Sequence, residues 1–225
     1  DNAPVRLPLS GPQTRITRAT FDAEYDRALG DGWRGDVTLT NLRRALSGLQ
    51  QAKLTGTGTI TPGDGALIGK LDGRVTLGLQ GLELADPASS RALGRDLSGG
   101  AHIDWSEGSA LNISSFALTG PDYSLLGSGT FGGVFDGLQI DIQGSTALTA
   151  ANLARFDALS GLPLSGAAQL QIDGRIQPLA GTFDAQIRGM GRDIGIGQPL
   201  VDPLIQGNAT LATHILRDET GTRLN

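Results

Sequence analysis

Apolar and polar side chains alternate with a period of two residues from one end of the chain to the other. Between residues 21 and 26, Phe21, Ala23 and Tyr25 alternate with three acidic residues, and the pattern returns near residues 75, 103, 140, 172, 185 and 213. A β-strand points successive side chains to opposite faces, so each segment predicts a strand with one apolar and one polar face. We therefore predict an all-β protein.

Three segments predict short helices instead. The stretch 86–94 has Asp86 as a helix cap and Pro87 at the first helical position. Helices so short and so few cannot cover both faces of a parallel sheet, and we expect them to cap an open end of the β structure. The other two segments, 41–51 and 150–160, show leucine and phenylalanine at helical spacing: Leu42, Leu46 and Leu49, and then Leu153, Phe156 and Leu159 after a Thr149 cap.

Glycine is abundant, with 34 residues, while aromatic residues make up only 4% of the chain. Part of this glycine recurs in a short pattern of an apolar residue, any residue, glycine, three residues and a second apolar residue. In a regular strand that glycine shares a face with both apolar residues, which predicts gaps along an apolar surface. Glycines that relieve strain at bends are an equal alternative. The pattern begins at Leu54, Leu71, Leu97, Leu125, Ile142, Leu164 and Ile205.

No motif points to catalysis, a metal or a nucleotide. The chain has no cysteine, and its two histidines, His102 and His214, stand apart from any second nitrogen ligand in the sequence. The stretch 127–132 fits G-x-G-x-x-G, but a strand pattern rather than a helix follows it, so we reject a dinucleotide site. Acidic residues at 22, 24 and 26 indicate a solvated strand face. We expect no enzymatic activity, no cofactor and no metal.

Charge and length set further bounds. A formal net charge of -5 disfavours nucleic acid as a partner. No run of about 18 to 20 apolar residues is present, so the sequence predicts no membrane-spanning helix. We find no linker in residues 1–225, and we expect one continuous β segment of a longer protein.

The last third of the chain resembles the TamB family of translocation and assembly module proteins of diderm bacteria. The resemblance is clearest over about residues 160 to 225 and rests on a run of phrases. They are LSGAA at 164–168, PLAGTFD at 178–184, GRDIGIG at 191–197, DPLIQG at 202–207 and RDETGTRL at 217–224.

This resemblance implies a folded-over β-sheet, or β-taco, whose concave face is a continuous apolar groove. Members of the family belong with AsmA-like and bridge-like lipid-transfer proteins and carry an inner-membrane anchor, which we expect to lie outside residues 1–225. The resemblance implies a periplasmic conduit for phospholipid, and a TamA-type outer-membrane barrel partner that would contact regions outside this chain. The residues expected to line the groove are Val75, Leu77, Leu79, Ile103, Leu125, Phe131, Leu138, Ile140, Ile142, Leu170, Ile172, Ile176, Phe183, Ile187, Leu211 and Ile215.

Two other functions and one other fold stay open at this stage. A scaffold or chaperone for outer-membrane proteins such as autotransporters would pair client strands with exposed β edges. A secreted adhesin or polysaccharide-acting enzyme would need an aromatic or acidic cleft, for which the chain has few aromatics. In a β-sandwich or β-helix the same apolar residues would pack against one another, and the alternation alone favours that arrangement.

Overall fold

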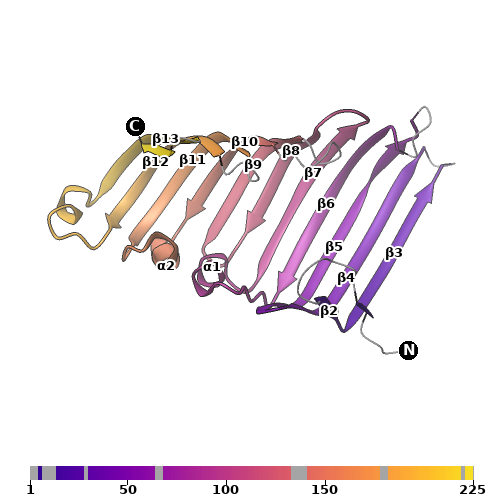
Figure 1. Cartoon of the computed structure of the whole chain (residues 1–225), viewed down its shortest axis with the longest axis horizontal. Coiled ribbons are helices and arrows are strands. Elements are labelled where there is room, and N and C mark those ends of the chain that lie inside the picture. Colours follow the sequence, from indigo (N-terminus) through magenta and orange to yellow (C-terminus); the bar gives the residue numbers. More distant parts are fainter. Residues whose placement is uncertain are drawn as a thin grey trace.

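The protein is one open antiparallel sheet, in which 69% of the residues are in strands. The structure, a computed structural model, describes residues 5–6, 14–27, 30–63, 68–132, 141–177, 182–218 and 221–224. From β4 (Gly32–Arg44) onward, each strand pairs with the next one in the chain, so the sheet is a long meander (Figure 1). The prediction of an all-β protein is confirmed.

The first half of the sheet ends at β7. Two short strands and β3 form its N-terminal edge, where β2 and β3 both pair with β4. The bounds are β1 (Val5–Arg6), β2 (Thr14–Ile16), β3 (Arg18–Asp26), β5 (Ser47–Thr61), β6 (Lys70–Gln80) and β7 (Leu97–Ser106).

The second half continues the meander to the C-terminal edge, where β14 pairs with the last four residues of β13. Small β-bulges interrupt the register between β7 and β8, between β8 and β9, and between β11 and β12. The bounds are β8 (Leu111–Thr119), β9 (Tyr123–Gly132), β10 (Asp141–Ala150), β11 (Ser165–Gln177), β12 (Thr182–Gly195), β13 (Asn208–Asp218) and β14 (Gly221–Leu224).

The described helices lie at one end of the strands. Helices α1 (Pro87–Leu93) and α2 (Asp157–Ser160) both lie at this end of the strands (Figure 1). The Asp86 carboxylate accepts hydrogen bonds from the backbone N–H groups of Ala88 and Ser89, at 3.3 and 2.9 Å. The predicted cap and first turn of α1 are therefore confirmed. A short 3₁₀ turn, η2 (Asp202–Leu204), lies in the β12–β13 connection.

The helix predicted over 150–160 is shorter than expected and has a different cap. It begins as a 3₁₀ turn, η1 (Leu153–Phe156), which leads directly into α2. The side chain of Asn152 accepts the capping hydrogen bond from the N–H of Ala154 at 3.1 Å. Thr149 lies inside β10, because pairing with β9 and β11 holds that residue extended.

The helix predicted over 41–51 is wrong. These residues form the β4–β5 hairpin, in which Leu42 lies opposite Leu49. Leu46 is at the turn with 81% of its surface exposed, so it does not share a face with the paired Leu42 and Leu49. Cross-strand pairing with distant segments outweighs the helical spacing of these three leucines, because local propensity determines secondary structure only weakly.

The apolar residues of the sheet do not form a sealed core. The chain exposes 14579 Å² of surface, whereas a compact protein of this mass exposes about 9,700 Å². Phe21 on β3 is 75% exposed and Leu211 on β13 is 50% exposed. All the described strands belong to one sheet, so the β-sandwich alternative is not what the chain forms.

A small core lies where the helices meet the sheet. Leu97, Tyr123 and Ala150 are buried there, and Leu93 of α1 and Phe156 of η1 pack against them. The Tyr123 hydroxyl donates a hydrogen bond to the carbonyl of Leu93 at 3.1 Å. The helices thus cover one end of the sheet's apolar side, in line with the capping role expected for them.

Candidate functional site: the apolar face

Strand register places most of the apolar residues of β3 to β13 on the same side of the sheet, which we call the apolar face; Leu126, Met190 and Leu216 lie on the other side. Directly paired residues of antiparallel strands point to the same side. The pairs Leu54 with Leu77, Leu125 with Leu148 and Ile172 with Ile187 illustrate the continuity of this face across the sheet.

Fourteen of the sixteen residues expected to line a groove lie on the apolar face. The other two, Leu138 and Ile140, lie outside the described residues. Binding of a lipid by any of them stays a prediction. The fourteen are Val75, Leu77, Leu79, Ile103, Leu125, Phe131, Ile142, Leu170, Ile172, Ile176, Phe183, Ile187, Leu211 and Ile215.

Three rows of residues cross the strands from β8 to β13 on this face. The rim row is nearest the hairpins opposite the helices, the inner row is nearest the helices, and the floor row lies between them. The rim row is Leu111, Phe131, Ile142, Ile176, Phe183 and Arg217; the floor row is Ile113, Gly129, Gly144, Gly174, Ala185 and Ile215; the inner row is Phe116, Gly127, Thr146, Ile172, Ile187 and Thr213.

A hollow of about 310 Å³ lies over the floor row, and we call it the slot. Phe131 and Ile176 border it on the rim side, and Phe116 and Ile172 border it on the inner side. Its depth comes from the glycines of the floor, which carry no side chain. The slot is therefore an open, almost wholly apolar trough that runs across the strands.

The floor requires glycine because the backbones approach closely there. A β-carbon at Gly144 would lie 2.4 Å from the carbonyl oxygen of Ser128, and one at Gly174 would lie 2.4 Å from that of Asp184. Real β-carbons are excluded at such distances. The glycines thus open the apolar face here, as one interpretation of the glycine pattern expected. Relief of strain at bends stays a prediction for these positions.

The glycines of the pattern fall into two groups when the whole sheet is considered. Gly56, Gly73 and Gly99 lie on the apolar face, as do the pattern's glycines on β9 and β10. Gly166 and Gly207 have positive φ angles of 89° and 78° at a bulge and a loop. The last two therefore serve the backbone conformation alone.

The corresponding gap near the N-terminal edge is filled by Trp33. Its indole lies over Gly56, Gly58 and Gly73, and its Nε1–H donates a hydrogen bond to the carbonyl of Asp72 at 3.2 Å. The alternation did not identify Trp33 as part of the apolar face. The signal was present in the glycines at 56, 58 and 73, but it depends on the register between strands.

The opposite side of the sheet is polar and carries the charged pairs. His102 Nε2 lies 3.0 Å from Asp72 Oδ2, and His214 Nε2 lies 2.6 Å from Asp184 Oδ1. Both histidines are surface residues, as expected. Among the residues that the structure describes, no group of three His, Cys, Asp or Glu side chains is arranged to hold a metal ion.

Arg175 and Asp141 form a second kind of pair on this polar side. The Arg175 Nε–H donates to both carboxylate oxygens of Asp141, at 2.8 and 2.9 Å. These hydrogen bonds lower the pKa of the Asp141 carboxyl. The pair links β10 to β11 beside the slot.

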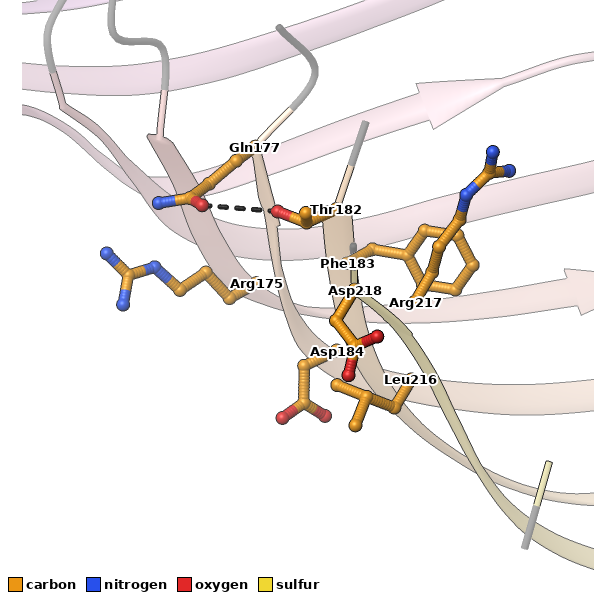
Figure 2. A pocket seen from close by; sticks show the side chains of 8 residues that line it. All are labelled: Arg175, Gln177, Thr182, Phe183, Asp184, Leu216, Arg217 and Asp218. Carbon is orange, nitrogen blue, oxygen red and sulfur yellow. Dashed lines mark hydrogen bonds between the residues drawn. The ribbon is translucent and has the colours of Figure 1, made fainter. Parts of the chain in front are cut away.

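A second hollow, of about 470 Å³, lies at the hairpin end of β11, β12 and β13 (Figure 2). Phe183 and Arg217 project to one side of it, and Arg175 and Asp184 project to the other. Thr182 Oγ1 donates to Gln177 Oε1 at 3.2 Å. Phe183 borders both hollows, but most of the residues that line this corner, among them Arg175, Asp184 and Asp218, lie on the polar side of the sheet by register.

The remaining motif is structural. Residues 127–132 lie inside strand β9, in continuous pairing with β10, which is not the strand-to-helix turn that a dinucleotide site requires. Within the described ranges, no helix is both long and apolar enough to span a membrane.

Comparison with known proteins adds no relative: no protein-family model, curated protein or solved structure matches this chain.

Proposed function

We propose that this chain is a segment of a non-enzymatic conduit that carries phospholipid acyl chains across the periplasm, between the inner and outer membranes. The observation that supports the proposal is the exposed apolar face, which is continuous over the described strands and hollowed into a slot across β8–β12. Exposed apolar surfaces of this extent on soluble folds mark binding sites for apolar partners.

The energetics suit an acyl chain. Burial of sixteen methylenes at about 0.8 kcal/mol each amounts to about 13 kcal/mol, so an apolar track needs no specific polar contact to hold a lipid tail. The floor row from Gly129 to Ile215 crosses four strand spacings, or about 19 Å. This length is comparable to that of an extended acyl chain with the same number of carbons.

The position of the helices favours one path for a ligand on the apolar face. They cover the apolar face at one end of the strands around Tyr123 and Leu97, whereas the slot lies toward the hairpin end. A ligand would therefore enter along the side that the helices leave uncovered and move across the strands. The side chains of β9 to β12 would form successive contacts for the same tail.

A photo-crosslinking residue at Ile172 tests the proposal in cells that make the full-length protein. Ile172 is half-buried on the slot's inner row, and the adjacent Gln171 is exposed on the polar side. We expect lipid to be captured from position 172 and not from 171. Equal capture at both positions, or capture of no lipid at either, would overturn the proposal.

An Ile172→Asp variant separates an open slot from an essential core. In a sealed core, a buried carboxylate costs several kcal/mol and would unfold a marginal domain. On this open face the carboxylate reaches water, so we expect an unchanged circular dichroism spectrum together with loss of lipid capture from a crosslinker at Phe131. Gln171→Asp is the matched control and should retain both.

A second function is favoured by the edge of the sheet. Among the described strands, β3 pairs with β4 alone, and its other side would then be available to a client strand, as a scaffold for outer-membrane proteins would require. The crosslinking experiment distinguishes the two functions. Protein adducts at β3 without lipid adducts at Ile172 would support the scaffold.

A further inference from the structure

We propose that Arg217 anchors the anionic head of an amphiphile whose tail lies in the slot. This inference rests on the proposed function and adds a ligand class and an orientation to it. The rim row runs through four apolar strand positions from Phe131 to Phe183 and then ends at Arg217. Of all the positions in the rim, floor and inner rows, Arg217 alone is charged.

The surroundings leave the Arg217 guanidinium available. Three other basic side chains at this corner are engaged: Arg175 with Asp141, His214 with Asp184, and Arg223 with Asp218 at 3.3 Å. In the described part of the chain, no carboxylate pairs with Arg217, which is exposed. An arginine with free donors beside an apolar track is suited to a phosphate or carboxylate.

The position of Arg217 fits the end of a tail. It lies directly opposite Phe183 in the register, and Phe183 borders both the slot and the corner hollow (Figure 2). A tail over the floor row therefore reaches the guanidinium where the apolar surface ends. The head would stand in water at the hairpin end, and the tail would point toward β8.

Binding of two amphiphiles with the same tail tests the proposal on the purified protein. Dodecyl phosphate carries an anionic head, whereas dodecyl maltoside carries an uncharged one. We expect Arg217→Gln to weaken dodecyl phosphate binding about tenfold, in the range for hydrogen bonds to charged groups, and to leave dodecyl maltoside within about twofold. Arg188→Gln is the matched control, since Arg188 is an exposed arginine on the polar side of β12, and it should change neither affinity.

The outcomes separate this inference from the proposed function. If neither amphiphile binds the unmodified protein, the lipid-binding function itself fails. If both bind and Arg217→Gln affects them equally, or Arg188→Gln has the same effect as Arg217→Gln, the anchor is wrong and the slot stands. Inorganic phosphate alone is the third arm: saturable binding as tight as that of dodecyl phosphate would show that the tail contributes nothing and would overturn the amphiphile assignment.

Discussion

The indole of Trp33 lies so close to Gly73 that a β-carbon at Gly73 would be 2.5 Å from ring atom Cζ2. Gly73 lies two strands away from Trp33, with Gly58 of β5 between them. The ring thus spans three strands, fills a gap in the apolar face and is fixed by its hydrogen bond to Asp72. A larger residue substituted at Gly73 should therefore destabilise the protein mainly by displacing Trp33.

Gly73→Val should destabilise the protein by about 1 to 3 kcal/mol, the usual cost of overpacking. The displaced indole should also show red-shifted fluorescence, measured in a Trp105→Phe background. Gly78→Val on the same strand is the control, because nothing lies within 4 Å of its missing β-carbon. An equal loss of stability at both positions would show that β6 tolerates no side chain at either glycine, whatever Trp33 does.

Tyr123 connects the helices to the sheet, and the contributions of its hydroxyl group and its aromatic ring can be tested separately. Tyr123→Phe removes the hydrogen bond to Leu93 and should cost about 1 kcal/mol. Tyr123→Ala also removes the buried ring that packs on Phe156, and we expect about 3 to 5 kcal/mol. Chemical denaturation measures both, and similar losses for the two variants would contradict the packing role of the ring.

Stability should fall in alkaline solution because burial raises the pKa of the Tyr123 phenol above its ordinary value of 10.0. The unfolded chain then ionises first, so the stabilising difference is complete below pH 10 and is lost as the pH rises through the folded-state pKa. Denaturation between pH 9 and 11, in a Tyr25→Phe background, measures this slope. The slope should disappear in Tyr123→Phe, and its persistence there would assign it to another group.

The N-terminal edge should make the isolated chain associate. Strand β3 has no second partner among the strands that the structure describes and exposes Phe21, and open edges of this kind pair with other strands. We expect concentration-dependent association in sedimentation experiments and its reduction by Phe21→Lys. Leu46→Lys, at an equally exposed hairpin tip, should leave association unchanged. A strict monomer at high concentration would refute the edge argument.

The local sequence pattern was sufficient to predict the strands, but it was insufficient to predict two of the three helices correctly. Alternation identified the sides of β6, β11 and β12 because the period of two is set by the backbone itself. The helix over 41–51 failed because Leu42, Leu46 and Leu49 fit both a helical stripe and a hairpin. Only pairing with the distant strands β2 and β6 decides between these, and such contacts are not visible in a local window.

The sequence by itself determined that this chain is a β protein with one apolar and one polar side, since alternation follows from strand geometry at every segment. The tertiary structure decided the rest. Strand register brought Gly129, Gly144 and Gly174 into one row, which made a slot of scattered glycines, and it placed Arg217 at the end of the row of Phe131 and Phe183. It also left the apolar face open, because the strands formed one layer and no second sheet covers them in the described part of the chain.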